Sequence, residues 1–350
     1  MCKDNHHYVP QFYLRKFSHN NRNIDMYISD KNKYIKNANI SKQASKKKFY
    51  GETDVIENDL MNLEHKVSII INKIIESKKF PSKETEEYSI LMIFILTSSA
   101  RVPREADNIS SMIDKFYKEL MIKDNSIDID EGDLNDFIIK SDVPSVLPMQ
   151  VAIKSYPAII DLKPILLISN CDKRFITSDN PVTKYNLFAV IRDYEMRGYG
   201  ITSRGLMIFL PLTDKICMLL YDEDVYEITG LNENILFICK GKIIDELNRL
   251  TYLDSYRFLY YKCDTNERYI SKLVNNNKPT FSTDNNFSVI PSNIGEVIGF
   301  HSHATRDRIN MNFVKLKSEY IKCELPSHLG GLNRPKAELL MKVVENYNFS

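Results

Sequence analysis

The sequence lacks both a long apolar run and a recognisable secretion signal. Its most apolar helix-like stretch extends from Ser89 to Ala100 and is shorter than the ~20 residues that a membrane-spanning helix needs. Polar residues and two histidines stand near the start, where a signal peptide carries its apolar segment. We therefore expect no contact with a membrane and a cytoplasmic location.

Cysteine is sparse, and no two of the six cysteines have the CxxC spacing of a zinc knuckle. Cys217 and Cys239 lie inside apolar runs, where a thiol usually behaves as a small buried hydrophobic group. This distribution predicts free thiols in a reducing compartment rather than a disulfide framework.

The chain also lacks a large excess of positive or negative charge, because its formal net charge is only +1. No global field therefore steers the chain to nucleic acid or to a membrane. Locally the balance differs: residues 1–50 hold eleven Lys or Arg against three Asp, whereas residues 121–145 hold seven acids against two Lys. The basic region could favour an anionic substrate, although such charge runs usually form solvated faces.

The apolar spacing changes along the chain and indicates the fold class. Residues 53–122 show the three- and four-residue spacing of amphipathic helices, with Pro81 ending the first helix and Ser82 capping the second. From Pro164 onward, short apolar runs predict strands, including a hairpin over residues 206–221.

We therefore expect an α+β fold, in which a helical bundle packs against a mostly antiparallel β-sheet. One domain should cover residues 1–262, with its helices at about 53–160 and its strands at about 164–262 and near the N-terminus. Residues 263–350 should form a C-terminal appendage of unknown role, which could bind a partner protein or a second copy of the chain.

The segment NHHYVPQFYLRKF, residues 5–17, is unusual for the beginning of a chain. Terminal residues are ordinarily polar and frayed. This segment carries aromatic residues together with polar groups that are costly to bury without a partner. We interpret it as one wall of a site, made where the N-terminus folds back to meet the corner at residues 177–181.

Several short motifs together give the chain a family resemblance. They are His6-His7-x-Val9-Pro10-Gln11-x-Tyr13-Leu14, Phe49-Tyr50, Arg101-x-Pro103, Thr177-Ser178-Asp179-Asn180-Pro181-Val182, Leu210-Pro211-Leu212 and Leu247-Asn248. With these motifs the chain resembles the DUF4238 family, a domain of unknown function, over about residues 5–262. The resemblance implies a domain boundary and singles out polar residues, but it brings no established activity; the character of the family suggests a toxin-like effector in bacterial antiviral defence.

The candidate site residues come from the N-terminal segment and from the corner at residues 177–181. His7 is the expected catalytic base, since imidazole changes its charge near neutral pH, and Asp179 would orient it or hold a metal. The expected substrate-binding residues are His6, Gln11, Tyr13, Arg101, Ser178 and Asn180. The corner could instead be an Asx-turn that bonds its own backbone.

Other residues have alternative explanations that the sequence leaves open. Arg101 could clamp phosphate or simply complement the C-terminus of a helix. Glu57 and Glu64 lie two turns apart on one helix edge, so they could face one pocket and hold Mg²⁺ or Mn²⁺, or remain solvated. His301, His303 and His328 include an HxH pair that could bind zinc, but no third ligand has a suitable spacing.

Three complete motifs are excluded or only partly matched. The acidic stretch from Asp124 has Ile129 where an EF-hand requires glycine. No SxxK serine accompanies the SDN triplet at 178–180, which excludes a β-lactamase. The His6-His7 start resembles the first strand of an HNH nuclease, but the Asn and the second His of that motif are not found at the required spacing.

The sequence thus predicts a hydrolase acting on a phosphodiester or a nucleotide, with Mg²⁺ or Mn²⁺ as candidate cofactors and nucleic acid or a nucleotide as candidate partner. The absence of a complete catalytic motif leaves open a binding or sensing protein without catalysis. A structural interaction protein is the third alternative.

Overall fold

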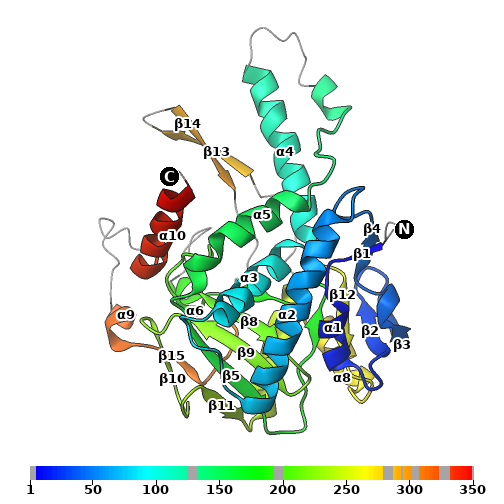
Figure 1. Ribbon diagram of the computed structural model, residues 1–350, viewed down its shortest axis with the longest axis vertical. Coiled ribbons are helices and arrows are strands. Elements are labelled where there is room, and N and C mark those ends of the chain that lie inside the picture. Colours follow the sequence, from blue (N-terminus) through cyan, green and yellow to red (C-terminus); the bar gives the residue numbers. More distant parts are fainter. Residues whose placement is uncertain are drawn as a thin grey trace.

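The computed structural model describes residues 5–123, 132–192, 200–278, 287–292, 295–300, 307–322 and 332–348. These residues form an α+β fold, as the sequence predicts (Figure 1). Most of the acidic stretch from Asp124, the EF-hand candidate, lies outside the described residues, as do His301, His303 and His328.

Long helices follow a short N-terminal β region, and most of the strands come after residue 160. The helices are α1 (Gln11–Leu14), α2 (Val55–Ser77), α3 (Glu86–Ala100), α4 (Pro103–Lys123), α5 (Val146–Ser155), α6 (Leu187–Ile191), α7 (Gly241–Leu253), α8 (Glu267–Asn275), α9 (Ser318–Lys322) and α10 (Pro335–Asn348). The strands are β1 (Asn5–His7), β2 (Asn23–Ile28), β3 (Lys33–Asn39), β4 (Ser45–Lys47), β5 (Lys163–Ser169), β6 (Thr177–Ser178), β7 (Thr183–Tyr185), β8 (Met207–Pro211), β9 (Ile216–Tyr221), β10 (Tyr226–Ile228), β11 (Ile235–Ile238), β12 (Phe258–Tyr261), β13 (Phe287–Ser292), β14 (Gly295–Phe300) and β15 (Val314–Leu316). Among the described residues, no helix combines the length and the apolar character that crossing a membrane requires.

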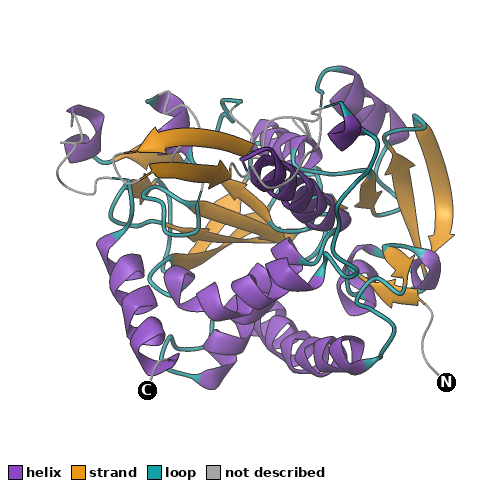
Figure 2. Cartoon of the chain, turned by 90° about the horizontal axis from the view of Figure 1, so that it is seen from above, coloured by secondary structure: helices purple, strands orange, loops and turns teal. Residues whose placement is uncertain are grey.

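A five-stranded sheet in the order β11-β5-β9-β8-β7 forms the centre of the molecule. Its pairs are antiparallel except for the parallel pair β11–β5. Alternate residues of β5 enter different cores: Leu166 packs with the core that includes α2 and α3, whereas Ile165 and Leu167 pack with α7. Because side chains alternate along a strand, the sheet separates two apolar layers, and Figure 2 shows helices covering one of its faces.

A second sheet in the order β3-β2-β12-β6 joins the N-terminal region to the β region. In it β2 pairs with β12, so that Tyr27 lies opposite Leu259. The buried Tyr13 hydroxyl is 2.8 Å from Thr177 Oγ1. The N-terminus therefore folds back to the corner at residues 177–181, as the sequence predicts.

Two local predictions need correction. Ser82 does not cap the second long helix: α3 begins later, and the Thr85 side chain accepts the backbone N–H of Tyr88. A capping hydroxyl immediately before the helix satisfies an N–H that has no partner within it, and Ser82 lies too far upstream to do so. Cys217 is buried, but Cys239 is exposed just beyond β11; the four cysteines of the described chain, Cys171, Cys217, Cys239 and Cys263, are all free thiols.

The described parts of the C-terminal extension pack against the domain that precedes them. Strand β15 pairs with β10, and residues 309–314 add apolar side chains to the core around α7. The Arg334 side chain is buried, and its Nε donates to Asp161 Oδ2 at 2.7 Å. The extension thus contributes to the packing of the whole molecule.

Replacing Tyr13 with phenylalanine tests the contact that holds the N-terminal segment against the β region. The change removes the hydroxyl that bonds to Thr177 Oγ1 in a fully buried setting. We expect the free energy of unfolding to fall by about 1–2 kcal/mol, measured from urea unfolding. The matched control, Tyr117→Phe at an exposed position of α4, should leave it nearly unchanged; equal effects would contradict the role of this contact.

Candidate functional site

A pocket of about 430 Å³ opens between the N-terminal segment and α2. We call it the His7 pocket. Its lining residues are Asn5, His7, Gln11, Phe12, Arg15, Glu57, Met61, Glu64, His65 and Ser68. Concave pockets with a few converging polar groups are the usual places for ligands, so this pocket is the first candidate for function.

The N-terminal wall presents three polar side chains spaced four residues apart. Strand β1 ends at His7, and Pro10, whose ring fixes its φ angle, precedes the single turn of α1. This geometry places His7, Gln11 and Arg15 in one hydrogen-bonded chain. Arg15 Nη2 donates to Gln11 Oε1 at 3.0 Å, and Gln11 Nε2 lies 3.2 Å from His7 Nε2.

Two neighbours of His7 Nε2 correspond to two protonation states of that nitrogen. Because Gln11 Oε1 accepts from Arg15, the amide nitrogen of Gln11 faces the ring and donates to His7 Nε2. In this arrangement the lone pair of Nε2 accepts the Gln11 N–H. The carbonyl oxygen of Ser41 lies 3.2 Å from the same nitrogen and would accept the N–H once the ring is protonated. His7 Nε2 can thus either accept a hydrogen bond from Gln11 or donate one to the Ser41 carbonyl.

The opposite wall is one face of α2. Glu57, Met61, Glu64 and Ser68 recur at the helical spacing that brings side chains to one face, and His65 lies beside them. The two carboxylates of α2 share the pocket, as their spacing predicts. The Glu57 side chain is buried.

Arg101 lies behind this wall rather than in it. Its side chain is only 1% exposed, and its Nη1 donates to Glu64 Oε1 at 2.8 Å. Burial lowers the pKa of Arg101, but Glu64 and Tyr50 outweigh burial, so that the pKa lies above its usual value. Within the described residues, Nε and Nη2 of Arg101 are buried without a hydrogen-bond partner. Arg101 therefore positions Glu64, and the structure does not place it where it would clamp a substrate directly.

Asp179 does not lie in the His7 pocket. Its carboxylate accepts the backbone N–H groups of Tyr256, Arg257 and Phe258 at 2.8–3.1 Å, and the side chain is buried. Burial raises the pKa of Asp179 to about 6, against the opposing effects of those three donors and of Arg104. The expected pairing of Asp179 with His7 is thus replaced by a structural role in the chain turn before β12.

The rest of the corner at residues 177–181 is also structural. Ser178 Oγ donates to the carbonyl of Asn180 and accepts its N–H. Asn180 Nδ2 donates to the backbone and side-chain oxygens of Asp254, which Arg104 also contacts. Ser178 and Asn180 are fully buried, so their expected contact with substrate is not supported by their place in the fold.

His6 and Tyr13 are likewise buried in the N-terminal wall. His6 Nδ1 accepts the backbone N–H of Tyr50 at 3.0 Å, and the two rings stack with their centroids 5.5 Å apart. Tyr13 binds Thr177 instead of facing the pocket. Both side chains therefore support the wall from behind, and only His7 and Gln11 of the predicted site residues reach the pocket.

The chemistry of the pocket offers limited support for a metal. In the described parts of the chain, no three His, Cys, Asp or Glu side chains lie close enough together to hold a metal ion. Glu57 and Glu64 supply carboxylates to the pocket, but Glu64 is already engaged by Arg101. A pair of carboxylates can hold Mg²⁺ or Mn²⁺ only with help from substrate oxygens and water.

The comparisons with known proteins add one finding. The family model described as "Protein of unknown function (DUF4238)" matches residues 5–265. The chain belongs to the DUF4238 family. No curated protein and no solved structure gave a significant match. The DUF4238 match contains both walls of the His7 pocket and ends before α8 begins.

Sequence reasoning missed four polar residues of this DUF4238 pocket: Asn5, Arg15, His65 and Ser68. Arg15 follows Gln11 by four residues, which is the signal that could have joined it to His7 and Gln11. His65 follows Glu57 by eight residues and Glu64 by one. A search for polar residues along one face of the first long helix would have found it.

Proposed function

We propose that the His7 pocket binds and hydrolyses a phosphate ester, either a phosphodiester or a nucleotide, with His7 as the general base. The observation that carries the proposal is the chain from Arg15 through Gln11 to His7, which presents a guanidinium and a proton acceptor in one pocket. A guanidinium matches the geometry of phosphate oxygens, and a positioned imidazole removes a proton from an attacking water.

The reaction follows from these positions. A water molecule, taking the place of the Gln11 amide at His7 Nε2, gives its proton to that nitrogen and adds to phosphorus. The Ser41 carbonyl accepts the new N–H, and Arg15 at the exposed end of the chain balances the charge of the phosphate. The bond from phosphorus to the leaving oxygen breaks, and His65 on the opposite wall, or water, supplies the proton that this oxygen needs.

A metal ion remains part of the proposal only as a cofactor that Glu57 and Glu64 would help to hold. Such an ion would neutralise the phosphate charge and polarise the phosphorus–oxygen bonds. Assays with Mg²⁺, with Mn²⁺ and with a chelator decide whether it is needed.

Replacing Arg15 with alanine tests the phosphate-binding role. We expect KM to rise about tenfold or more, because a charge-assisted hydrogen bond contributes about 1.5–3 kcal/mol, with a smaller change in kcat. The assay presents RNA, DNA, cyclic dinucleotides and nucleoside triphosphates to the full-length protein. Arg22→Ala, which removes an exposed arginine outside the pocket, should leave KM unchanged; equal losses in both variants would contradict the proposal.

A binding or sensing protein without catalysis is the second candidate. It is favoured by the position of Asp179, which is committed to backbone amides and does not orient His7. Under this alternative, one of the same ligands binds and Arg15→Ala weakens the binding, but wild type turns none of them over. Neither binding nor turnover of any of them would contradict both candidates.

Two broader roles also remain proposals. A toxin-like effector in bacterial defence would reduce the growth of a bacterial host when expressed, and a His7→Ala variant expressed to the same level would not. A partner protein or a second copy of the chain bound through residues 263–350 would shift the elution of the full-length protein on a sizing column.

A further inference from the structure

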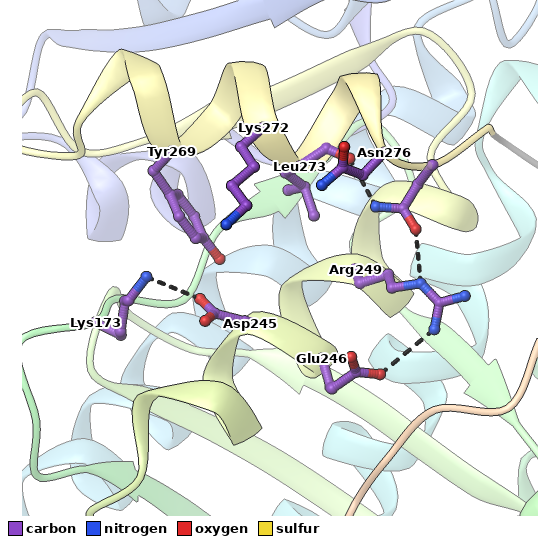
Figure 3. Close-up of a pocket in the computed structure, with 9 residues that line it drawn as sticks. Lys173, Asp245, Glu246, Arg249, Tyr269, Lys272, Leu273 and Asn276 are labelled. Atoms are coloured by element: carbon purple, nitrogen blue, oxygen red, sulfur yellow. Dashed lines mark hydrogen bonds and ion pairs between the residues drawn. The ribbon is translucent and has the colours of Figure 1, made fainter.

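A second pocket of about 330 Å³ lies between α7 and α8 (Figure 3). It shares no lining residue with the His7 pocket. We call it the α7–α8 pocket. One wall is made by Lys173, Asp245, Glu246 and Arg249, all within the family match, and the other by residues 269–277 of the extension. The extension after residue 265 is therefore what completes this pocket.

Lys173 is held in a defined position at one end of the pocket. Its ammonium lies 3.1 Å from Asp245 Oδ1 and 4.4 Å from the centre of the Tyr269 ring. Its aliphatic part crosses Gly241, where an added Cβ would come within 2.9 Å of Lys173 Cγ. The absence of a side chain at Gly241 thus makes room for this lysine, whose ammonium has three N–H donors.

The acids of the pocket are already neutralised by cations of the same wall. Asp245 pairs with Lys173, and Glu246 lies 3.4 Å from Arg249 and also accepts the backbone N–H of Asn310. Arg249 further bonds Asn277 and Asp307. Lys173 is thus paired with Asp245, and Arg249 is shared between Glu246 and Asp307.

Lys272 is the lining cation that takes no part in these pairs. Figure 3 shows its side chain extending from α8 toward α7, between Tyr269 and Leu273. Within the part of the chain that the structure describes, its ammonium has no hydrogen-bond or ion-pair partner. The Asn276 side chain, one turn further along α8, also lines the pocket. The pocket lining carries three cations and two acids, and Asp307, beyond the lining, is a further acid on Arg249. The donors on the α8 side, Lys272 and Asn276, are exposed to solvent at the pocket.

We propose that the α7–α8 pocket binds a small anionic molecule through its phosphate or carboxylate oxygens. Lys272, Lys173 and Asn276 would donate hydrogen bonds to those oxygens, while Tyr269 and Leu273 contact the remainder of the ligand. The volume corresponds to about ten water molecules at ~30 Å³ each, which suits a small metabolite rather than a polymer. This site is independent of the His7 pocket and of the reaction proposed there.

Isothermal titration of the full-length protein with inorganic phosphate and with malonate, at constant ionic strength, tests this site. We expect at least one of the two anions to bind, and the better one indicates whether phosphate or carboxylate is the preferred group. Lys272→Gln should weaken that binding about tenfold or more, the loss expected for a hydrogen bond to a charged group. Gly241→Ala should also weaken it, because the new methyl group displaces Lys173 while every charge is kept.

Two controls separate this site from general charge effects and from the His7 pocket. Lys278→Gln removes an exposed positive charge just beyond α8 and outside the pocket, and it should leave the affinity unchanged. Arg15→Ala removes only binding at the His7 pocket, so the event lost in Lys272→Gln should remain in it. The proposal is overturned if neither anion binds to wild type, or if Lys272→Gln binds as tightly as Lys278→Gln.

Discussion

Replacing Asp179 with alanine should lower the free energy of unfolding by about 3–5 kcal/mol, the cost of leaving buried polar groups without their charged partner. Three consecutive backbone N–H groups, those of residues 256–258, donate to this one buried carboxylate. The methyl group of alanine leaves all three without this acceptor, beside a side-chain position that is only 1% exposed. Urea unfolding followed by circular dichroism measures the change.

The matched control is Asp172→Ala, which removes an exposed aspartate before the same corner and should change stability little.

Comparing wild type with Asp179→Asn tests the direction in which stability changes with pH. The folded pKa of about 6 lies above the unfolded value of about 3.9, so the folded protein binds more protons between these values. The stability advantage of wild type over Asp179→Asn should therefore grow as pH falls from about 7 to about 5; a shrinking advantage would contradict this environment.

Replacing His7 with alanine should reduce turnover by about 10²–10⁴-fold, the usual contribution of a positioned general base. Stability should change little, because the side chain is partly exposed and its contacts with Gln11 and Ser41 lie at the surface. The measurement is kcat on the phosphate ester identified with wild type, with the unfolding midpoint recorded for the same samples.

His19→Ala is the control for this variant, since His19 is exposed and lies outside the pocket. His19→Ala should keep wild-type turnover. If His7→Ala also keeps wild-type turnover, His7 is not the base. If the unfolding midpoint of His7→Ala drops below the assay temperature, the loss is structural, and turnover of the two proteins is compared again below that midpoint.

The sequence predicted that the N-terminal segment folds back to the corner at residues 177–181, but not that β2 pairs with β12. Aromatic and apolar residues in the first turn-sized segment could not remain in water, and the structure places Tyr13 against Thr177 and pairs β2 with β12. The alternation and spacing of apolar residues also predicted the long helices and the hairpin of β8 and β9. These features depend on local periodicity, which a single sequence displays directly.

The polar residues were harder to assign because motif content does not show which way a side chain faces. Ser178, Asp179 and Asn180 have the residue types of a catalytic site, yet they satisfy backbone groups of residues 180 and 254–258. The backbone partners of Asp179 lie more than 70 positions further along the sequence, so the residues around Asp179 do not reveal them. Conversely, Arg15 and His65 carry no motif and reach the pocket through helix geometry alone.

Chemical rescue of His7→Ala by free imidazole tests the central claim most directly. The account predicts that imidazole, entering the space left by the side chain, restores turnover in a saturable manner and in proportion to its neutral fraction as pH is varied. No restoration in a folded variant, beside an active wild type, would show that position 7 does not supply the base.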